Sequence, residues 1–506
     1  MRQNIANPTL ILKNGGFLFV RLLFVMAIAF YTTRLTLQIL GDSDYGINNI
    51  VGGVISVFAI ISMPITGALQ RFFNVEFTKG DIEGRVVFTS SVRIIAFLAI
   101  GMTILYETVG LIVINEVLNY PLGRQWAVNV VFQFAVLTNL LYFFTLSYSS
   151  LLYAKEDMGV PATIEIVMAL LKLGLLIIIP FVSIDFLVAY GVMLFLVSAV
   201  QLLFYFIYCR RKYAEATLCK ETDSRLQKDI LKFAGWSSIN SIAGISVTYI
   251  SNVLLNVFGG VLYNTAYGLS MQLTNAVMSF STNVMKAVDP QITSTTVAGQ
   301  DTYRNKMVIS TIKVCILASG FVYVLFCFYG DFLLRIWLGR VPDYVYSFCC
   351  VSLLNILFTS IVLPLRTIIM ATGRIQRLFV NYGLISLVAM LLMYALLWLE
   401  CPPIVVMYVI CAVGVTYFFN ALWIVRNLTS LHALTIIKEM IKVGSILLVI
   451  AILVRLPLIW IPQSAGGFIM TSVIAFIVLM FMAYAFVLSE TERRYLLKIK
   501  NKLLHK

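Results

Sequence analysis

Apolar residues occur along this chain in long runs that are separated by short polar segments. Each run has about 20 residues, enough for a helix to cross a hydrocarbon core of roughly 30 Å. The runs lie at residues 16–40, 46–70, 86–109, 127–152, 160–183, 185–209, 233–257, 261–287, 307–329, 344–365, 378–399, 403–425, 443–461 and 467–488. No segment between them is long enough to fold as a soluble domain. The pattern predicts an all-α polytopic membrane protein with about 14 transmembrane helices.

The two halves of the chain show a faint repeat. Residues 11–19 read ILKNGGFLF and residues 230–238 read ILKFAGWSS, and both copies open a helix that we expect to end at a glycine turn, Gly41 or Gly259-Gly260. Six spans followed by six spans in the same orientation form a parallel repeat. We therefore expect an N-terminal six-helix lobe at 1–210, a cytoplasmic inter-lobe loop at 211–232, a C-terminal six-helix lobe at 233–430, and two extra helices with a basic cytoplasmic tail at 431–506.

The basic residues predict the orientation in the membrane. With the N-terminus inside, about 28 of the 37 lysines and arginines lie in inner segments. The outer segments hold only Arg124, Arg335 and Arg340. This bias places both termini in the cytoplasm. It also explains the net charge of +14 without nucleic acid, which we exclude as a partner.

The composition excludes several classes of function. The chain is 60% hydrophobic and 12% charged, whereas soluble proteins have about 25% charged residues. The eight cysteines lack the spacing of metal ligands, and the two histidines, His432 and His505, are far apart in the sequence. No glycine-rich nucleotide-binding loop is present. We therefore expect no metal and no cofactor.

Polar residues recur along one face of three predicted helices. The stripes include Asn49 in the second span, Asn252 in the seventh and Asn275 in the eighth. At membrane depth such residues must face protein or a water-filled cavity, and close helix packing would also explain them. Because the second and eighth spans are equivalent in the repeat, we expect a shared central cavity. The three asparagines are therefore candidate substrate-binding residues.

Charged residues within the spans are a sharper signal. Arg34 lies in the outer half of the first span, and Lys172 lies near the middle of the fifth, where a cation is most costly. We expect both to face a cavity, the alternative being structural ion pairs. Glu165 shares a helix face with Lys172 but lies about 10 Å away along the axis. Arg21 is a third candidate, although about 220° separates it from Arg34 around an ideal helix.

Other intramembrane cations lie close to a membrane surface. Arg21, Arg93, Lys286 and Lys313 fall within about two turns of the inner surface, and Arg455 lies near the outer one. Long basic side chains at such depths can extend to the lipid phosphates. This explanation and a role in a cavity are about equally favoured for the inner residues.

The first outer loop contains an acidic pair, Asp42 and Asp44. Such a pair could serve a membrane sugar transferase. Those enzymes also need large outer loops that hold substrate, and most outer loops here have only a few residues. We interpret the pair as a polar turn, and we expect that the protein is not an enzyme.

The N-terminal region resembles a known family, the Wzx-like polysaccharide flippases of the multidrug/oligosaccharidyl-lipid/polysaccharide exporter superfamily. The match is strongest over residues 17–81, and beyond them it is one of architecture. The residues that carry it are Tyr31-Thr32-Thr33-Arg34, Leu40-Gly41, Asp44-Tyr45-Gly46, Val51-Gly52-Gly53, Gln70-Arg71-Phe72, Glu76 and Gly80-Asp81.

The resemblance implies a substrate and a mechanism. Members of this family move undecaprenyl-pyrophosphate-linked oligosaccharides across the bacterial inner membrane by alternating access, for the synthesis of surface polysaccharides such as O-antigen. Arg34 matches a position of the family motif, whereas Lys172 rests on its depth alone. Guanidinium groups bind phosphate oxygens in pairs, so a cationic cavity would hold the diphosphate while the lipid tail stays in the membrane.

Other functions remain open at this point. A multidrug-type exporter coupled to a proton or sodium ion would rely on buried acidic residues, of which the spans contain few, chiefly Glu165 and Glu107. A membrane glycosyltransferase or polymerase would require Asp42 or Asp44. The expected partners are the lipid-linked oligosaccharide and membrane lipid. The sequence determines neither which glycan is carried nor the oligomeric state.

Overall fold

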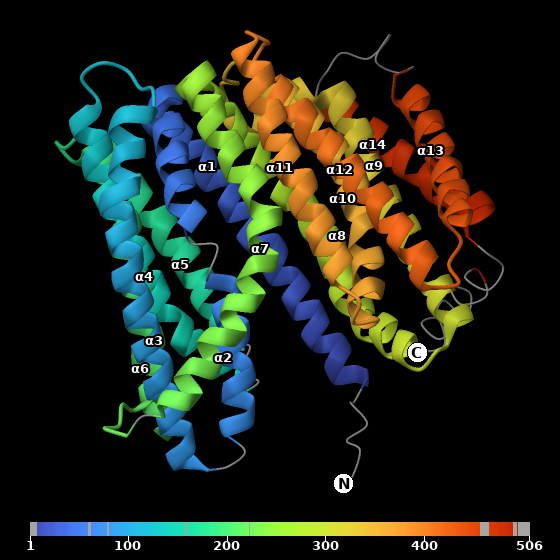
Figure 1. Ribbon diagram of the computed structural model, residues 1–506. Coiled ribbons are helices and arrows are strands. Elements are labelled where there is room, and N and C mark those ends of the chain that lie inside the picture. The colour runs from blue at the N-terminus through green and yellow to red at the C-terminus, as the bar shows by residue number, and fades with distance from the viewer. Residues whose placement is uncertain are drawn as a thin grey trace. The chain divides into compact units, whose positions relative to one another are not determined.

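A computed structural model of the chain describes residues 8–58, 62–77, 80–155, 157, 159–221, 223–455, 465–488 and 493. These residues are almost entirely helical and include no strand (Figure 1). Among them, ten segments are long and apolar enough to cross a membrane. The predicted fold class, an all-α polytopic membrane protein, is confirmed.

The helices follow one another with short connections. They are α1 (Pro8–Phe58), α2 (Ser62–Glu76), α3 (Asp81–Leu105), α4 (Gln125–Ala154), α5 (Gly159–Ile178), α6 (Phe186–Lys212), α7 (Ser224–Gly259), α8 (Val261–Val297), α9 (Asp301–Leu338), α10 (Val345–Ala371), α11 (Gln376–Trp398), α12 (Val405–Leu428), α13 (Ala433–Arg455) and α14 (Ala465–Met482). Two π-helical segments, η2 (Tyr106–Gly110) and η3 (Val113–Val117), extend α3, and a third, η7 (Ala483–Val487), follows α14.

Glycines separate the first and second predicted spans, and the seventh from the eighth. Within α1 the backbone breaks at Gly41, where φ is 75° and ψ is 174°. Gly260, between α7 and α8, has a φ of 84°. Side chains with a Cβ rarely adopt these conformations. The glycine turns expected at both places are confirmed.

The chain divides into two compact units, Met1–Thr265 and Ala266–Lys506. In the first, α4 packs against α6 and α2, while α1 packs against α5 and α7. In the second, α10 packs between α9 and α12, and α13 joins α9 to α14. The seventh helix thus packs with the first unit, and the predicted division at 211–232 stays a prediction.

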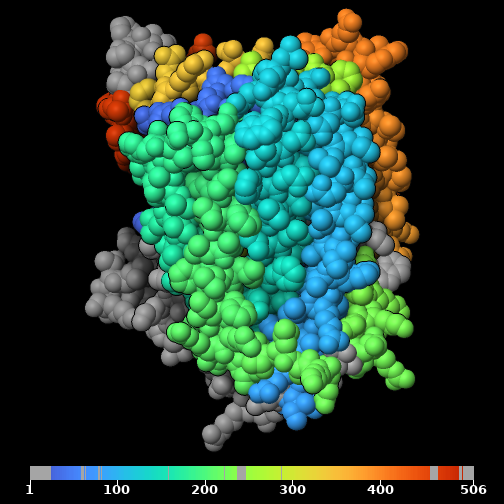
Figure 2. All heavy atoms as spheres, turned by 90° about the vertical axis from the view of Figure 1, so that its left-hand side faces the viewer, coloured from blue at the N-terminus to red at the C-terminus, as the bar shows by residue number. Residues whose placement is uncertain are grey.

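One face of the first unit is formed by α3, α4 and α6, which appear in blue to green in Figure 2. These helices carry large exposed apolar side chains, among them Phe97 and Ile100 on α3, Trp126 on α4, and Leu203 and Phe204 on α6. Exposed apolar side chains on this scale are unfavourable in water and favourable against lipid. We interpret this face as a membrane-contacting surface.

The charged loop after α6 is folded against the first unit. The Nζ of Lys212 lies 2.7 Å from the Oδ2 of Asp157, which also accepts hydrogen bonds from the hydroxyls of Tyr208 and Tyr213. Burial of Asp157 opposes its ionisation, but these hydrogen bonds lower its pKa below the ordinary value. Glu215, farther along the loop, is buried and pairs with Lys155. The loop is thus held by ion pairs at the end of the unit where α4 meets α5.

Candidate functional site

Arg34 and Lys172 both lie in the first unit, on helices that pack against each other. Arg34 is on α1, seven residues before the break at Gly41, and Lys172 is on α5. Both side chains are half-buried. The Lys172 ammonium lies 5.8 Å from the ring centroid of Tyr190, a buried residue of α6, a geometry in which the aromatic face attracts a cation. The fold therefore provides two cations on adjoining helices of one unit.

The other predicted site residues have different surroundings. Arg21 belongs to α1, but its side chain lies outside the described residues. Asn275 lies on α8 in the second unit, where its side chain is exposed. Asn49 and Asn252 lie in the first unit and contact each other directly.

A network of asparagine side chains joins α1, α7 and the start of α8. Asn252 donates to the Oδ1 of Asn49 at 3.1 Å, and Asn264 donates to the Oδ1 of Asn252 at 2.8 Å. Asn256 donates to the Oδ1 of Asn264 at 2.9 Å and exchanges hydrogen bonds with the backbone of Asn119. Buried amides need such partners, and in this conformation the amides of Asn49 and Asn252 have them within the protein. Their role in substrate binding stays a prediction.

Of the other members of this network, Asn264 lies on the polar stripe of the eighth span, whereas Asn119 and Asn256 were not predicted from the sequence. Asn256 was within reach of a sequence argument, because it follows Asn252 by one helical turn on the same stripe of α7. Asn119 had no such signal, since it lies in a connecting segment 137 residues away in sequence from its partner Asn256.

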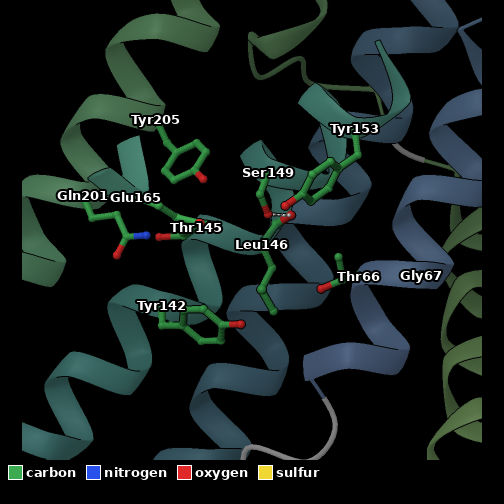
Figure 3. Close-up of a pocket in the computed structure, with 10 residues that line it drawn as sticks. All are labelled: Thr66, Gly67, Tyr142, Thr145, Leu146, Ser149, Tyr153, Glu165, Gln201 and Tyr205. Carbon is green, nitrogen blue, oxygen red and sulfur yellow. Dashed lines mark hydrogen bonds between the residues drawn. The ribbon is translucent and has the colours of Figure 1, made fainter. Parts of the chain in front are cut away.

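A polar cavity opens within the first unit. Its volume is about 310 Å³. Figure 3 shows side chains from α2, α4, α5 and α6 around the same space. The lining residues are Thr66, Gly67, Tyr142, Thr145, Leu146, Ser149, Tyr153, Glu165, Gln201 and Tyr205. Glu165, predicted only as an ion-pair candidate for Lys172, is the carboxylate of this cavity.

Three connections at one end of the first unit meet at Arg124. Its guanidinium binds the carboxylate of Asp44 through two nitrogens, with Nε 3.0 Å from Oδ1, and it also binds Asp185. Asp185 in turn caps α6 by accepting from the backbone of Leu187 at 3.0 Å. The desolvation of Arg124 is outweighed by its two acidic partners, which raise its pKa. The carboxylate of Asp44 is therefore engaged in an ion pair, and a role of Asp42 and Asp44 as turn residues alone stays a prediction.

Loss of this cluster should reduce stability more than glycan export. We expect Arg124→Gln to lower the free energy of unfolding by about 2 kcal/mol, because charge-assisted hydrogen bonds to two carboxylates disappear together. Changing both Asp42 and Asp44 to Asn should lower the free energy of unfolding less, because an amide oxygen can still accept from Arg124, and should leave glycan export near the wild-type level. Thermal unfolding of the purified variants measures stability, and a complementation assay measures export. Abolished export at normal protein level in the double Asn variant would revive the transferase interpretation.

In the second unit, Lys313 does not extend to a membrane surface. Its side chain on α9 is buried, and its ammonium donates to the carbonyl oxygen of Val487 at 3.0 Å. The Oε2 of Glu439, on α13, lies 3.5 Å from the same nitrogen. Lys313 thus connects α9 to α13 and η7. By contrast, Lys286 on α8 and Arg455 on α13 are exposed, as the sequence analysis allows for cations near a surface.

The chain matches no protein-family model and no curated protein sequence. It does match solved structures. A lipid II flippase, MurJ, in an inward closed conformation aligns with a TM-score of 0.69 at 12% identity, covering 92% of this chain and 98% of the flippase. An inward-facing multidrug resistance MATE family transporter of the MOP superfamily aligns with a TM-score of 0.61 at 13% identity, covering 80% and 95%.

A further MATE transporter, solved in complex with MaL6, aligns with a TM-score of 0.53 at 12% identity and covers 79% of this chain. At these identities the likeness is one of fold. The chain has the polytopic helical fold of these flippase and exporter structures, and no enzyme is among the structures named here.

Proposed function

We propose that this protein is a flippase that moves undecaprenyl-pyrophosphate-linked oligosaccharide across the bacterial inner membrane by alternating access, for surface polysaccharide synthesis. The observation that carries the proposal is the pair of cations, Arg34 and Lys172, on adjoining helices of one unit, each within a segment long and apolar enough to cross a membrane. A cation there costs at least about 2.5 kcal/mol on insertion scales. An anionic ligand that enters the membrane would offset this cost.

The chemistry of a lipid-linked oligosaccharide fits these residues. Its diphosphate and sugars cannot cross hydrocarbon unaided, because each unpaired polar group costs several kcal/mol. A guanidinium binds two phosphate oxygens at once, and an ammonium adds a second positive charge. An inside-negative potential would assist outward movement of the negative headgroup by about 2.3 kcal/mol per charge per 100 mV. The fold likeness to a lipid II flippase supports the same class of substrate.

A cation-coupled multidrug exporter is the second candidate. The MATE structures support it by fold, and Glu165, an exposed carboxylate that lines a polar cavity, is its candidate acidic residue. A proton or sodium ion remains a candidate coupling ion for either function. The flippase is favoured because such an exporter gives no role to two intramembrane cations in the first unit.

A membrane glycosyltransferase or polymerase is the weakest candidate. Asp44 binds Arg124, so the acidic turn already has a structural partner. For transport we expect neither a catalytic residue nor a cofactor.

The direct test is transport by the purified protein. The full chain is reconstituted into liposomes that contain a fluorescent polyprenyl-diphosphate oligosaccharide, and outer-leaflet probe is measured with a membrane-impermeant quencher. We expect accelerated exchange between leaflets that is lost in Arg34→Ala. Exchange of a cationic drug instead of the lipid-linked sugar would support the exporter.

The proposed orientation predicts the location of both termini and of the inter-lobe loop. Reporter fusions at residue 220 and at the C-terminus should give fluorescence with a cytoplasmic fluorescent protein and no activity with a periplasmic phosphatase. A fusion at Gly123 should behave in the opposite way and serves as the control. Phosphatase activity at residue 220 would contradict the topology and the assignment of the repeat.

A further inference from the structure

The polar cavity of Figure 3 has several hydrogen-bond acceptors in its wall. The hydroxyls of Thr66, Thr145 and Ser149 donate to backbone carbonyls of their own helices at 2.8, 3.1 and 3.2 Å. Their protons are thereby engaged, and their oxygens remain able to accept hydrogen bonds. Glu165 adds a carboxylate, which accepts only, and Gln201 adds an amide that can both donate and accept. Such a wall suits a ligand with several hydroxyl donors.

The size of the cavity favours a ligand of this kind over a single ion. About 310 Å³ is at the lower end of small-molecule pockets, whereas a single water takes up about 30 Å³ of the liquid. A bound proton or sodium ion would leave most of this space without a role. Three tyrosines, Tyr142, Tyr153 and Tyr205, supply rings with an apolar face and a polar tip. A sugar ring has matching C–H faces and hydroxyl edges.

The order of groups along α5 matches the order of groups in the proposed substrate. Glu165 and Lys172 are seven residues apart, hence on the same helix face and separated by about 10 Å. In the proposed orientation Glu165 is nearer the cytoplasm. A lipid-linked oligosaccharide has its diphosphate between the lipid and the glycan. With the diphosphate at Lys172, the first sugars would extend toward Glu165.

We infer that this cavity is the subsite that recognises the glycan, binding the hydroxyls of the pyranose closest to the diphosphate. Glu165 and Gln201 hold these hydroxyls, and Tyr205 packs against the ring. The inference rests on the proposed function and extends it: Arg34 and Lys172 bind the part common to all such lipids, while this cavity determines which sugar is accepted.

The test compares two probes on the full chain in lipid nanodiscs. One is a polyprenyl diphosphate that carries a single pyranose, drawn from a panel of hexoses and N-acetylhexosamines, and the other is the same lipid without sugar. We expect at least one sugar to tighten binding to the wild type. Glu165→Gln and Gln201→Leu should each reduce that gain about tenfold and leave the affinity for the sugar-free probe unchanged.

Controls separate recognition from folding. Thr163→Val changes an exposed hydroxyl on α5, about 200° around the helix from Glu165, and should alter neither affinity. Only variants whose unfolding temperature equals that of the wild type are compared. If Glu165→Gln and Gln201→Leu do not fold, Tyr205→Phe provides a conservative alternative. It keeps the buried ring and should lose a smaller part of the affinity gained from the sugar.

The outcomes distinguish this inference from the proposal on which it rests. If no sugar in the panel tightens binding, or if the variants weaken both probes equally, the cavity is not a glycan subsite. The same conclusion follows if Glu165→Gln changes only the pH or sodium dependence of binding, which would indicate a cation site. If neither probe binds the wild type, or if Arg34→Ala leaves the affinity for the sugar-free probe unchanged, the flippase proposal itself is contradicted.

Discussion

Replacing Arg34 or Lys172 by alanine should reduce glycan export at least about tenfold without lowering the amount of protein in the membrane. Each variant loses charge-assisted hydrogen bonds to the diphosphate, which are worth about 1.5–3 kcal/mol, and removes a cation that is costly in the membrane. Arg34→Lys should restore part of the export, because the charge remains while the paired contacts of a guanidinium are lost.

The measurement is surface glycan in a strain that lacks the chromosomal gene, together with the membrane level of each variant. Arg455→Ala is the matched control, since it removes an exposed cation near the end of α13 and should export normally. Normal export by both Arg34→Ala and Lys172→Ala would contradict the cationic site. A parallel fall in protein level would instead identify these residues as structural ion-pair partners.

Replacing Lys313 by methionine should destabilise the second unit by about 3–5 kcal/mol, as is typical when one partner of a buried ion pair is removed. The change leaves the carboxylate of Glu439 without its nearest cation and the carbonyl of Val487 without its ammonium donor. Adding Glu439→Gln to the same chain should recover part of the loss, because the carboxylate charge is then gone.

Thermal unfolding of the purified protein and its level in the membrane measure this effect. Lys286→Met serves as the control, because Lys286 is exposed on α8 and its loss should have little effect. Wild-type stability of Lys313→Met would show that the contact with Glu439 and Val487 contributes nothing. If Glu439→Gln does not recover stability, the loss in Lys313→Met comes from the hydrogen bond to the carbonyl of Val487 alone.

The helices and their breaks could be predicted from the sequence because both depend on local properties. Hydrocarbon selects apolar runs of about 20 residues wherever they occur in the chain, and a positive φ selects glycine at Gly41 and Gly260. The depth of Lys172 follows from its position within a single run. These features require no knowledge of which helices are neighbours.

Partnerships between helices depend on the tertiary structure. Asn49 and Asn252 are separated by 203 residues in sequence, and Lys313 and Val487 by 174. Helical periodicity shows that each residue belongs to a polar face, or that a cation is buried, but it gives no direction toward a particular partner. For Lys313 the sequence left two explanations equally favoured, contact with lipid phosphates and a role in a cavity. The structure shows a third, an ion pair with Glu439 on α13 and a hydrogen bond to Val487 of η7.

The sequence by itself determined that this protein crosses the membrane many times as helices, and it singled out Arg34 and Lys172, because burial in lipid penalises polar groups at every position alike. Only the tertiary structure showed that Asp44 binds Arg124 and that Glu165 lines a cavity with residues of α2, α4 and α6. The physical reason is that a cavity or an ion pair is made by side chains that several helices bring together, and their distances are set by packing between helices instead of by the period within one.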